Sequence, residues 1–182
     1  MEFHIDKTIT LRELLSTDAG DIFRTIDRQR EYLGRWLPFV ETTRSPEDSR
    51  AFISSVVDAP EDRFEHVFSI RDTDTFIGLV GFKDTDRQNK KTEIGYWLSE
   101  DRQGQGIVTR AVRRLCEFAF SELGMNRIQI KCAVGNEGSK RIPLRLGFTL
   151  EGVERDGELL SGGVYTDLEI YSLLKRDVPG DQ

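Results

Sequence analysis

Apolar residues recur along the chain with two different periods, and these separate the expected strands from the expected helices. Short apolar runs bounded by polar turns are typical of strands, and three of them follow one another closely enough to form an antiparallel meander. A further run alternates apolar and polar residues. The expected strands lie at residues 66–70, 76–82, 92–98, 127–134, 149–155 and 165–174, with a short strand or hairpin at 4–14.

Two helices are expected before the meander. Asp18 can serve as the N-cap of the first, over residues 18–36, whose apolar residues lie near one face. Those residues are Ile22, Phe23, Ile26 and Leu33. The second helix has a clearer start, because Ser45 can cap it and Pro46 suits its first position.

The strongest helical period covers residues 107–123, which Gly124 can end. Its apolar stripe consists of Val108, Val112, Leu115, Ala119 and Leu123. A shorter helix is expected at 138–146, ending at Gly147. The strands on either side of the long helix should be parallel and joined by a right-handed crossover. We therefore expect a mixed sheet with helices on both faces.

Composition narrows the class of protein. The 182 residues suffice for one domain, and 37% apolar with 32% charged residues is typical of a soluble globular protein. No apolar run approaches the roughly 20 residues of a transmembrane helix, and the stretch MEFHIDKTIT lacks the regions of a signal peptide. We therefore expect a cytoplasmic protein with no membrane association.

Charge and metal-ligating residues exclude further classes. The net charge of −6 argues against nonspecific nucleic-acid binding and is compatible with a cationic substrate, such as an amine or a basic peptide. Cys116 and Cys132 are not closely paired, so we expect both to be reduced and structural. With only His4 and His66 available, neither a metal site nor a histidine triad is expected. Base rates favour a homodimer.

Gly104 and Gly106 lie where the strand at 92–98 gives way to the helix at 107–123. A helix N-terminus attracts phosphate, and glycines let the backbone approach a pyrophosphate closely. The stretch lacks the Lys and Ser/Thr of a P-loop and the third glycine of a dinucleotide fingerprint. Taken alone, the two glycines are equally consistent with a flexible turn, or with a protein that binds another phosphate-bearing ligand.

Two segments together resemble the Gcn5-related N-acetyltransferase superfamily. The stretch RQGQGIVTRAV is similar to its acyl-CoA pyrophosphate loop, with Gln103 and Gly106 at defined positions and Val108 where Gly or Ala is usual. NEGSKRIPLRLGF resembles its second CoA-proximal segment, Asn-x-x-(Ala/Ser) running into a helix that ends in Gly-Phe. The combination is much more specific than either part, and the order of elements agrees from residue 3 to about 175.

The resemblance implies an α/β fold of the acyl-CoA N-acyltransferase type in a single domain over residues 1–182. Its mixed, mostly antiparallel sheet would contain a central splayed pair of parallel strands. TEIGYWLSEDRQGQGI and LEGVERDGEL are also similar to the subfamily that acetylates the N-terminal α-amine of ribosomal proteins. The implied co-substrate is acetyl-CoA and the implied partner is an amine acceptor.

The resemblance also assigns the cofactor-binding residues. The pantetheine arm would lie beside the strand that ends at Trp97, Leu98 and Ser99, whose backbone groups would face the thioester. The pyrophosphate would lie on main-chain N–H groups of the following loop. Those loop residues are Gln103, Gly104, Gln105, Gly106, Ile107 and Val108. Asn136 would hydrogen-bond the pantetheine or the neighbouring backbone.

Two glutamates are candidates for the base that deprotonates the amine. By strand alternation, Glu93 shares a face with Gly95 and Trp97, and related enzymes use a glutamate near this position. Partial burial would raise its pKa and make it a better base. The alternative is a carboxylate that faces solvent or pairs with a lysine such as Lys90 or Lys91. Glu158 is the second candidate by the same resemblance, although a glutamate in a turn is usually solvated.

Ser139 is the candidate acid. Many superfamily members have a tyrosine in the helix that follows, and Pro143 stands at the matching position here. The ribosomal-protein subfamily has a serine at the position of Ser139, close to the CoA sulfur, and its hydroxyl can donate a hydrogen bond to a forming thiolate. The alternative role is a helix cap.

Trp36 and Phe39 are the expected substrate-binding residues, because related enzymes line the acceptor cleft where the first helix ends; aromatic residues there are also commonly core. We expect an N-acetyltransferase that acts on a protein N-terminus. Two alternatives stay open at this point. The acceptor is a small amine such as a polyamine, an amino acid or an antibiotic, or the chain binds CoA without turnover.

Overall fold

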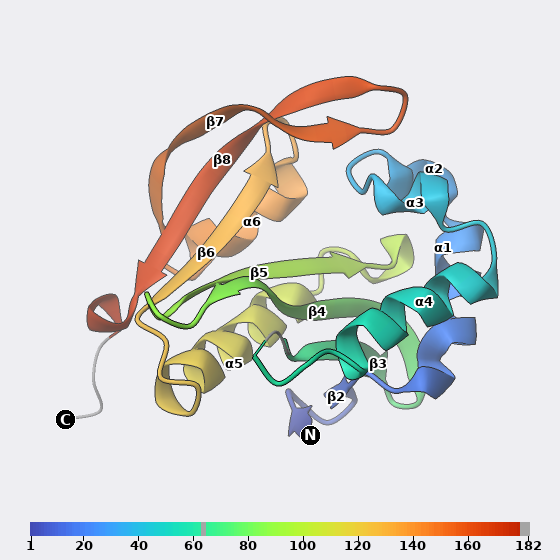
Figure 1. The fold of residues 1–182 in the computed structure, drawn as a ribbon, viewed down its shortest axis with the longest axis horizontal. Coiled ribbons are helices and arrows are strands. Elements are labelled where there is room, and N and C mark those ends of the chain that lie inside the picture. Colours follow the sequence, from blue (N-terminus) through green and yellow to red (C-terminus); the bar gives the residue numbers. More distant parts are fainter. Residues whose placement is uncertain (63–64, 179–182) are drawn as a thin grey trace.

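The computed structural model describes residues 1–62 and 65–178, and its centre is an eight-stranded mixed sheet (Figure 1). The order of strands across the sheet is β1-β2-β3-β4-β5-β6-β8-β7. Their bounds are β1 (Glu2–His4), β2 (Ile9–Glu13), β3 (Val67–Asp72), β4 (Thr75–Asp86), β5 (Lys91–Leu98), β6 (Arg127–Ala133), β7 (Thr149–Leu160) and β8 (Val164–Leu174). The meander is confirmed, because β3, β4 and β5 pair antiparallel in succession.

Helices cover both faces of the sheet, as predicted. They are α1 (Ala19–Arg28), α2 (Arg30–Gly34), α3 (Phe39–Thr42), α4 (Pro46–Val57), α5 (Ile107–Ser121) and α6 (Glu137–Arg145), with 3₁₀ turns at Ser16–Asp18, Glu100–Arg102 and Lys175–Asp177. One apolar core joins α5 and α6 to the sheet, and a second joins α1 to α4 to the opposite face. Alternation along β5 separates the two cores, with Ile94 and Leu98 in the first and Trp97 in the second.

The parallel pair β5 and β6 is splayed. These strands pair only from Lys91 with Arg127 to Glu93 with Gln129. Beyond Glu93 no described residue of β5 pairs with β6, which continues against β8 instead. Figure 1 shows β6, β7 and β8 leaning away from β5 past this point. The last residues of β5 therefore have one unpaired backbone edge beside a gap in the sheet.

Asp18 precedes α1 as expected, but its carboxylate does not cap the helix. Instead, Arg12 Nη2 and Arg71 Nη2 donate to Asp18 Oδ1 at 2.6 and 2.7 Å, and the Leu15 N–H donates to Oδ2 at 3.0 Å. The side chain of Asp18 is 1% exposed. This buried cluster joins α1 to β2 and β3, a tertiary contact that outweighs the local cap preference of aspartate.

The predicted first helix is interrupted at Gln29, whose φ of −131° separates α1 from α2. The start of α4 is confirmed, since the Asp48 carboxylate accepts from the Ser45 N–H at 2.8 Å. The helix α5 begins at Ile107 as predicted and ends at Ser121, two residues early, so Leu123 only packs against the core from outside the helix. The shorter helix α6 lies one residue earlier than predicted.

The prediction that Glu158 lies in a turn is wrong. The polar sequence around it forms a bulge between Glu154 and Glu158, where Asp156 has a φ of 50°, and β7 continues to Leu160. Glu158 pairs with Thr166 of β8. A strand holds its side chain in a fixed direction, whereas a turn at the surface would leave it free.

Candidate active site

A cavity of about 1320 Å³ passes through the gap between β5 and β6. Its lining comes from both faces of the sheet. Glu93 and Trp97 belong to the face covered by α1 to α4, whereas Val108, Ser139 and Ile142 belong to the side of α5 and α6. The splayed strands therefore leave one continuous space in which a molecule on one face can meet a molecule on the other.

The loop before α5 can hold an anion. Gly104 and Gly106 have φ values of +75° and +69°, and a Cβ added at Gly104 would meet no atom within 4 Å. No protein acceptor in the described chain takes the backbone N–H groups of residues 104–106, and the first N–H groups of α5 follow directly. Arg110 fixes the conformation of this loop, because its guanidinium donates to the Gln105 carbonyl at 3.0 Å and to the Asp6 carboxylate at 3.0 Å. These groups fit a bound pyrophosphate.

Gln29 fixes the junction between β5 and this loop. Its side-chain oxygen accepts from the Glu100 N–H at 2.8 Å, and its Nε2 donates to Ser99 Oγ at 3.3 Å. Gln103 Nε2 in turn donates to the Leu98 carbonyl at 3.4 Å. The break between α1 and α2 thus places the Gln29 side chain against Ser99 and Glu100, just before the candidate pyrophosphate loop. No local sequence pattern indicates this contact.

Glu93 lies on the predicted face of β5 but is not a free carboxylate. It is 5% exposed, its Oε1 lies 2.9 Å from Lys83 Nζ, and its Oε2 accepts from Gln129 Nε2 at 3.2 Å. The pairing alternative is thus the arrangement found, with Lys83 of β4 in place of Lys90 or Lys91. Both contacts lie at the last residue pair of β5 and β6 before the two strands diverge.

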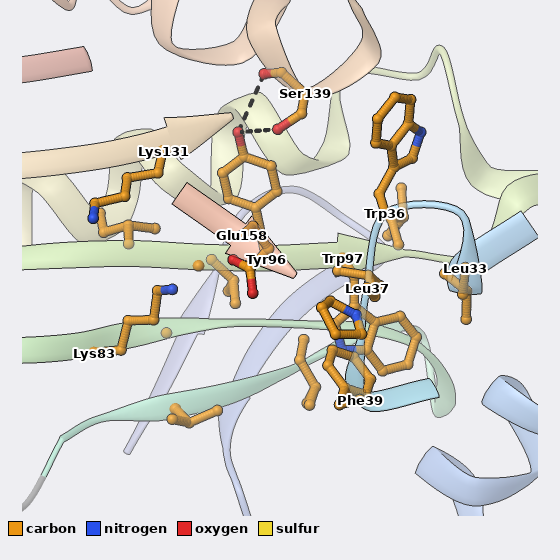
Figure 2. Close-up of a pocket in the computed structure, with 18 of the residues that line it drawn as sticks. Leu33, Trp36, Leu37, Phe39, Lys83, Tyr96, Trp97, Lys131, Ser139 and Glu158 are labelled. Atoms are coloured by element: carbon orange, nitrogen blue, oxygen red, sulfur yellow. Dashed lines mark hydrogen bonds between the residues drawn. The ribbon is translucent and has the colours of Figure 1, made fainter. Parts of the chain in front are cut away.

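Glu158 lines the same cavity and is partly exposed. Among the described residues, no hydrogen bond or ion pair occupies its carboxylate. Figure 2 shows this carboxylate in the pocket, with Lys83 and Lys131 extending from β4 and β6. Lys83 is paired with Glu93, and Lys131 donates to Glu154 at 2.8 Å. Of the two glutamates named from the sequence, Glu158 is therefore the one free to accept a proton from a bound amine.

Ser139 does not cap α6. Asn136 is the N-cap, and its side-chain oxygen accepts from the Ser139 N–H at 3.2 Å. This agrees with the expectation that Asn136 binds neighbouring backbone, and it frees the serine hydroxyl for another contact. Ser139 Oγ lies 3.4 Å from the Sγ of Cys132, which is buried and reduced. Burial raises the pKa of Cys132, so this thiol stays protonated near neutral pH.

Tyr96 is a candidate functional residue that the sequence alone did not single out. Its hydroxyl lies 3.1 Å from Ser139 Oγ and 3.2 Å from the Ser139 carbonyl oxygen (Figure 2). Burial, assisted by the adjacent Cys132, raises the pKa of Tyr96 well above its usual range. One signal was present, because alternation puts Tyr96 on a core face and a buried tyrosine hydroxyl needs a partner.

Trp36 and Phe39 both line the cavity, and neither belongs to the buried cores. Trp36 extends from the loop between α2 and α3, and a Cβ added at Gly135 would lie 3.7 Å from its ring. The loop after β6 therefore lies close to this tryptophan. Phe39 is 39% exposed, which leaves its ring available to a ligand.

The residues that the structure describes contain no group of three or more His, Cys, Asp or Glu side chains arranged to hold a metal ion. No helix formed by residues 1–62 and 65–178 is both long and apolar enough to cross a membrane.

The acetyltransferase (GNAT) domain family matches residues 8–149. The chain therefore belongs to this family, and it is an N-acetyltransferase. The co-substrate loop, the splayed strands and the cavity described above are consistent with that class of enzyme.

Several relatives share nearly the whole length of the chain. YdaF of Bacillus subtilis (strain 168), whose name assigns it only provisionally to ribosomal N-acetylation, is 36% identical over 98% of this chain and 97% of its own. The ribosomal-protein-serine acetyltransferase of Escherichia coli (strain K12) is 30% identical over 92% of this chain and 93% of its own.

Solved structures show the same fold with ligands bound. RimL, a ribosomal L7/L12 α-N-protein acetyltransferase in complex with CoA, is 25% identical with a TM-score of 0.91, covering 98% of this chain and 100% of its own. The microcin C7 self-immunity acetyltransferase MccE, in complex with acetyl-CoA and AMP, is 32% identical with a TM-score of 0.87, covering 93% and 94%.

Proposed function

We propose that this N-acetyltransferase uses acetyl-CoA to acetylate the N-terminal α-amine of a protein, such as a ribosomal protein, by direct transfer. The observation that carries the proposal is the cavity through the sheet, with Ser139 on the side of α5 and α6 and the unoccupied carboxylate of Glu158 also in its lining. The relatives named above as ribosomal-protein acetyltransferases support this acceptor class.

On the acceptor side, Glu158 is proposed as the base. An ammonium group is attracted to its carboxylate, which removes one proton and leaves the nitrogen lone pair free to attack. Glu93 is proposed as a positioning residue, because its contacts with Lys83 and Gln129 fix β5 against its neighbours. Trp36 and Phe39 are proposed to pack against the residues that follow the α-amine.

On the donor side, the N–H groups of residues 104–108 hold the pyrophosphate. The Gln103 N–H does not belong to this set, contrary to the sequence prediction, because it donates to the Glu100 carbonyl at 3.2 Å. The free edge of β5 at Trp97, Leu98 and Ser99 holds the pantetheine arm, except for the Ser99 N–H, which donates to the Ile77 carbonyl of β4 at 2.8 Å. The amine nitrogen attacks the thioester carbonyl, so a C–N bond forms and the C–S bond breaks. The electron pair goes to the sulfur, to which the Ser139 hydroxyl donates a hydrogen bond, and the second proton lost by the nitrogen ends on this sulfur, so that CoA leaves as the thiol. No bond forms between the acetyl group and the protein.

A panel of N-terminal peptides and small amines, with CoA release as the measurement, tests this proposal. Peptide N-termini should be acetylated at rates well above those of polyamines, amino acids and aminoglycosides. If small amines alone support CoA release, the protein acceptor is wrong. Stabilisation against heat by NAD or ATP, with none by CoA, would overturn the donor as well.

The contact of Gln29 with the loop leads to a prediction for the donor. Gln29→Ala removes two hydrogen bonds that fix Ser99 and Glu100, each of about 1 kcal/mol. The KM for acetyl-CoA should therefore rise by up to roughly thirtyfold, with little change in the KM for the acceptor. Steady-state kinetics with each substrate varied in turn measures this, and Arg28→Ala, an exposed neighbour, serves as the control. An equal rise in both KM values would contradict it.

A further inference from the structure

The hydroxyl groups of Tyr96, in β5, and Ser139, in α6, lie 3.1 Å apart beside the gap between β5 and β6. We propose that Tyr96 is a positioning residue that holds the Ser139 hydroxyl proton toward the thioester sulfur. This inference rests on the proposed function, and it concerns how the serine is made an effective donor. Tyr96 itself gives up no proton in the reaction.

Pro143 explains why Tyr96 can take this place. In a helix, the carbonyl of Ser139 would normally accept from the N–H four residues on, and that residue is Pro143, which has none. The Tyr96 hydroxyl lies 3.2 Å from this carbonyl and can donate to it instead. Pro143 therefore leaves an acceptor in α6 that holds the tyrosine of β5 against this turn of the helix.

The Tyr96 hydroxyl has a single proton and two acceptors within reach, the Ser139 carbonyl and Ser139 Oγ. When it donates to Oγ, the serine proton cannot point back along the same line. That proton is then directed into the cavity, which both residues line. When the tyrosine donates to the carbonyl, the serine can donate to the tyrosine oxygen, and its proton is withdrawn from the cavity.

The surroundings keep Tyr96 in the form that this role requires. A tyrosine whose ionisation is suppressed by burial remains an O–H donor throughout the neutral pH range. Cys132, the other neighbour of Ser139 Oγ, is a weak hydrogen-bonding partner and competes poorly for the serine proton. A chain of hydroxyl groups in which the first donates to the second makes the second a stronger donor to the sulfur.

The first test is kinetic. Tyr96→Phe should lower kcat roughly tenfold, the size expected for loss of one hydrogen bond to a developing charge, and leave the KM for acetyl-CoA nearly unchanged. In a Ser139→Ala background the same change should have no further effect, because its only route is through the serine. Tyr171→Phe removes another buried tyrosine hydroxyl, which donates to Glu169 at 2.8 Å, and should leave kcat unchanged.

The variant Pro143→Ala distinguishes a purely structural role of Tyr96 from the proposed positioning of the Ser139 hydroxyl. This variant supplies the missing N–H to the Ser139 carbonyl, so the double variant Tyr96→Phe, Pro143→Ala should regain stability without regaining kcat. If Pro143→Ala restores kcat, Tyr96 only satisfies an orphaned carbonyl and the inference is wrong. Additive losses from Tyr96→Phe and Ser139→Ala would overturn it equally.

A binding measurement needs no acceptor. By calorimetry, the unaltered protein should bind CoA about tenfold more tightly than desulfo-CoA, through the serine contact with sulfur. Tyr96→Phe and Ser139→Ala should each reduce that ratio to near one. If CoA binds but Tyr96→Phe leaves the ratio intact, only this inference fails. If the unaltered protein does not bind CoA, the proposed function fails and the inference fails with it.

Discussion

Replacing Glu158 by glutamine should lower kcat for amine acetylation by roughly 10²- to 10⁴-fold, the usual contribution of a positioned general base. The amide keeps the size of the side chain and its place in β7 but cannot take a proton from the ammonium group. Steady-state kinetics with a peptide acceptor measures the loss of kcat.

Glu154→Gln is the matched control for this prediction, because Glu154 lies on the same strand and pairs with Lys131. It should retain most of the activity. Glu93→Gln should act mainly on stability, since it removes the negative partner of Lys83 in a buried position. The assignment of the base is wrong if Glu158→Gln keeps the full rate while Glu93→Gln abolishes transfer in a protein of unchanged stability.

Asp18→Asn should lower the free energy of unfolding by about 3–5 kcal/mol, the cost of breaking a buried ion pair by removing one partner. Arg71, with a side chain 10% exposed, would keep its charge inside the protein with only Asp21 and the Asp74 carbonyl to balance it. The Leu15 N–H would also lose its acceptor. Urea denaturation followed by circular dichroism measures the change.

The exposed pair of Arg30 with Asp27 provides the comparison for Asp18, as Asp27 has a side chain 53% exposed. Asp27→Asn should cost less than about 1 kcal/mol. Similar small losses for both variants would show that the buried cluster contributes little. Neither Glu158 nor Ser139, the proposed base and hydrogen-bond donor, is among the partners of Asp18, so Asp18→Asn protein that remains folded should keep its kcat.

Most of the fold could be predicted from the sequence because its strands and helices follow from the local spacing of apolar residues. The meander, the long helix α5 and its glycine-rich N-terminus all follow from patterns within about 15 residues. The errors occurred where a distant contact decided the outcome. The local sequence predicts that Asp18 caps a helix. The structure instead pairs its carboxylate with Arg71 of β3, which is far away in the sequence. The sequence ERDGE is typical of a turn. In the structure these residues form a bulge within β7, and the hairpin turn follows Leu160.

The candidate site was only partly predictable for the same reason. The candidate backbone cradle at 103–108 depends on glycines in one segment, so it can be predicted from the sequence. The environment of each glutamate depends on which strands lie beside it and in what register. Lys83 lies opposite Glu93 only because β4 and β5 pair at that position. Tyr96 meets Ser139 across 43 residues of sequence, which no local pattern encodes.

The passage of the cavity through the sheet has a consequence for how such enzymes diversify. In the proposed function the donor half is built from β5, α5 and α6, while the acceptor half draws on α2, α3 and the β7–β8 hairpin. Because the two halves draw on different elements, substitutions of acceptor-side residues that do not touch the donor side can accumulate without disturbing it. A lineage can therefore change the amine it modifies while inheriting its acyl donor intact. A library confined to residues 35–39, 157, 159 and 160, with Glu158 kept, is the economical route to a new acceptor.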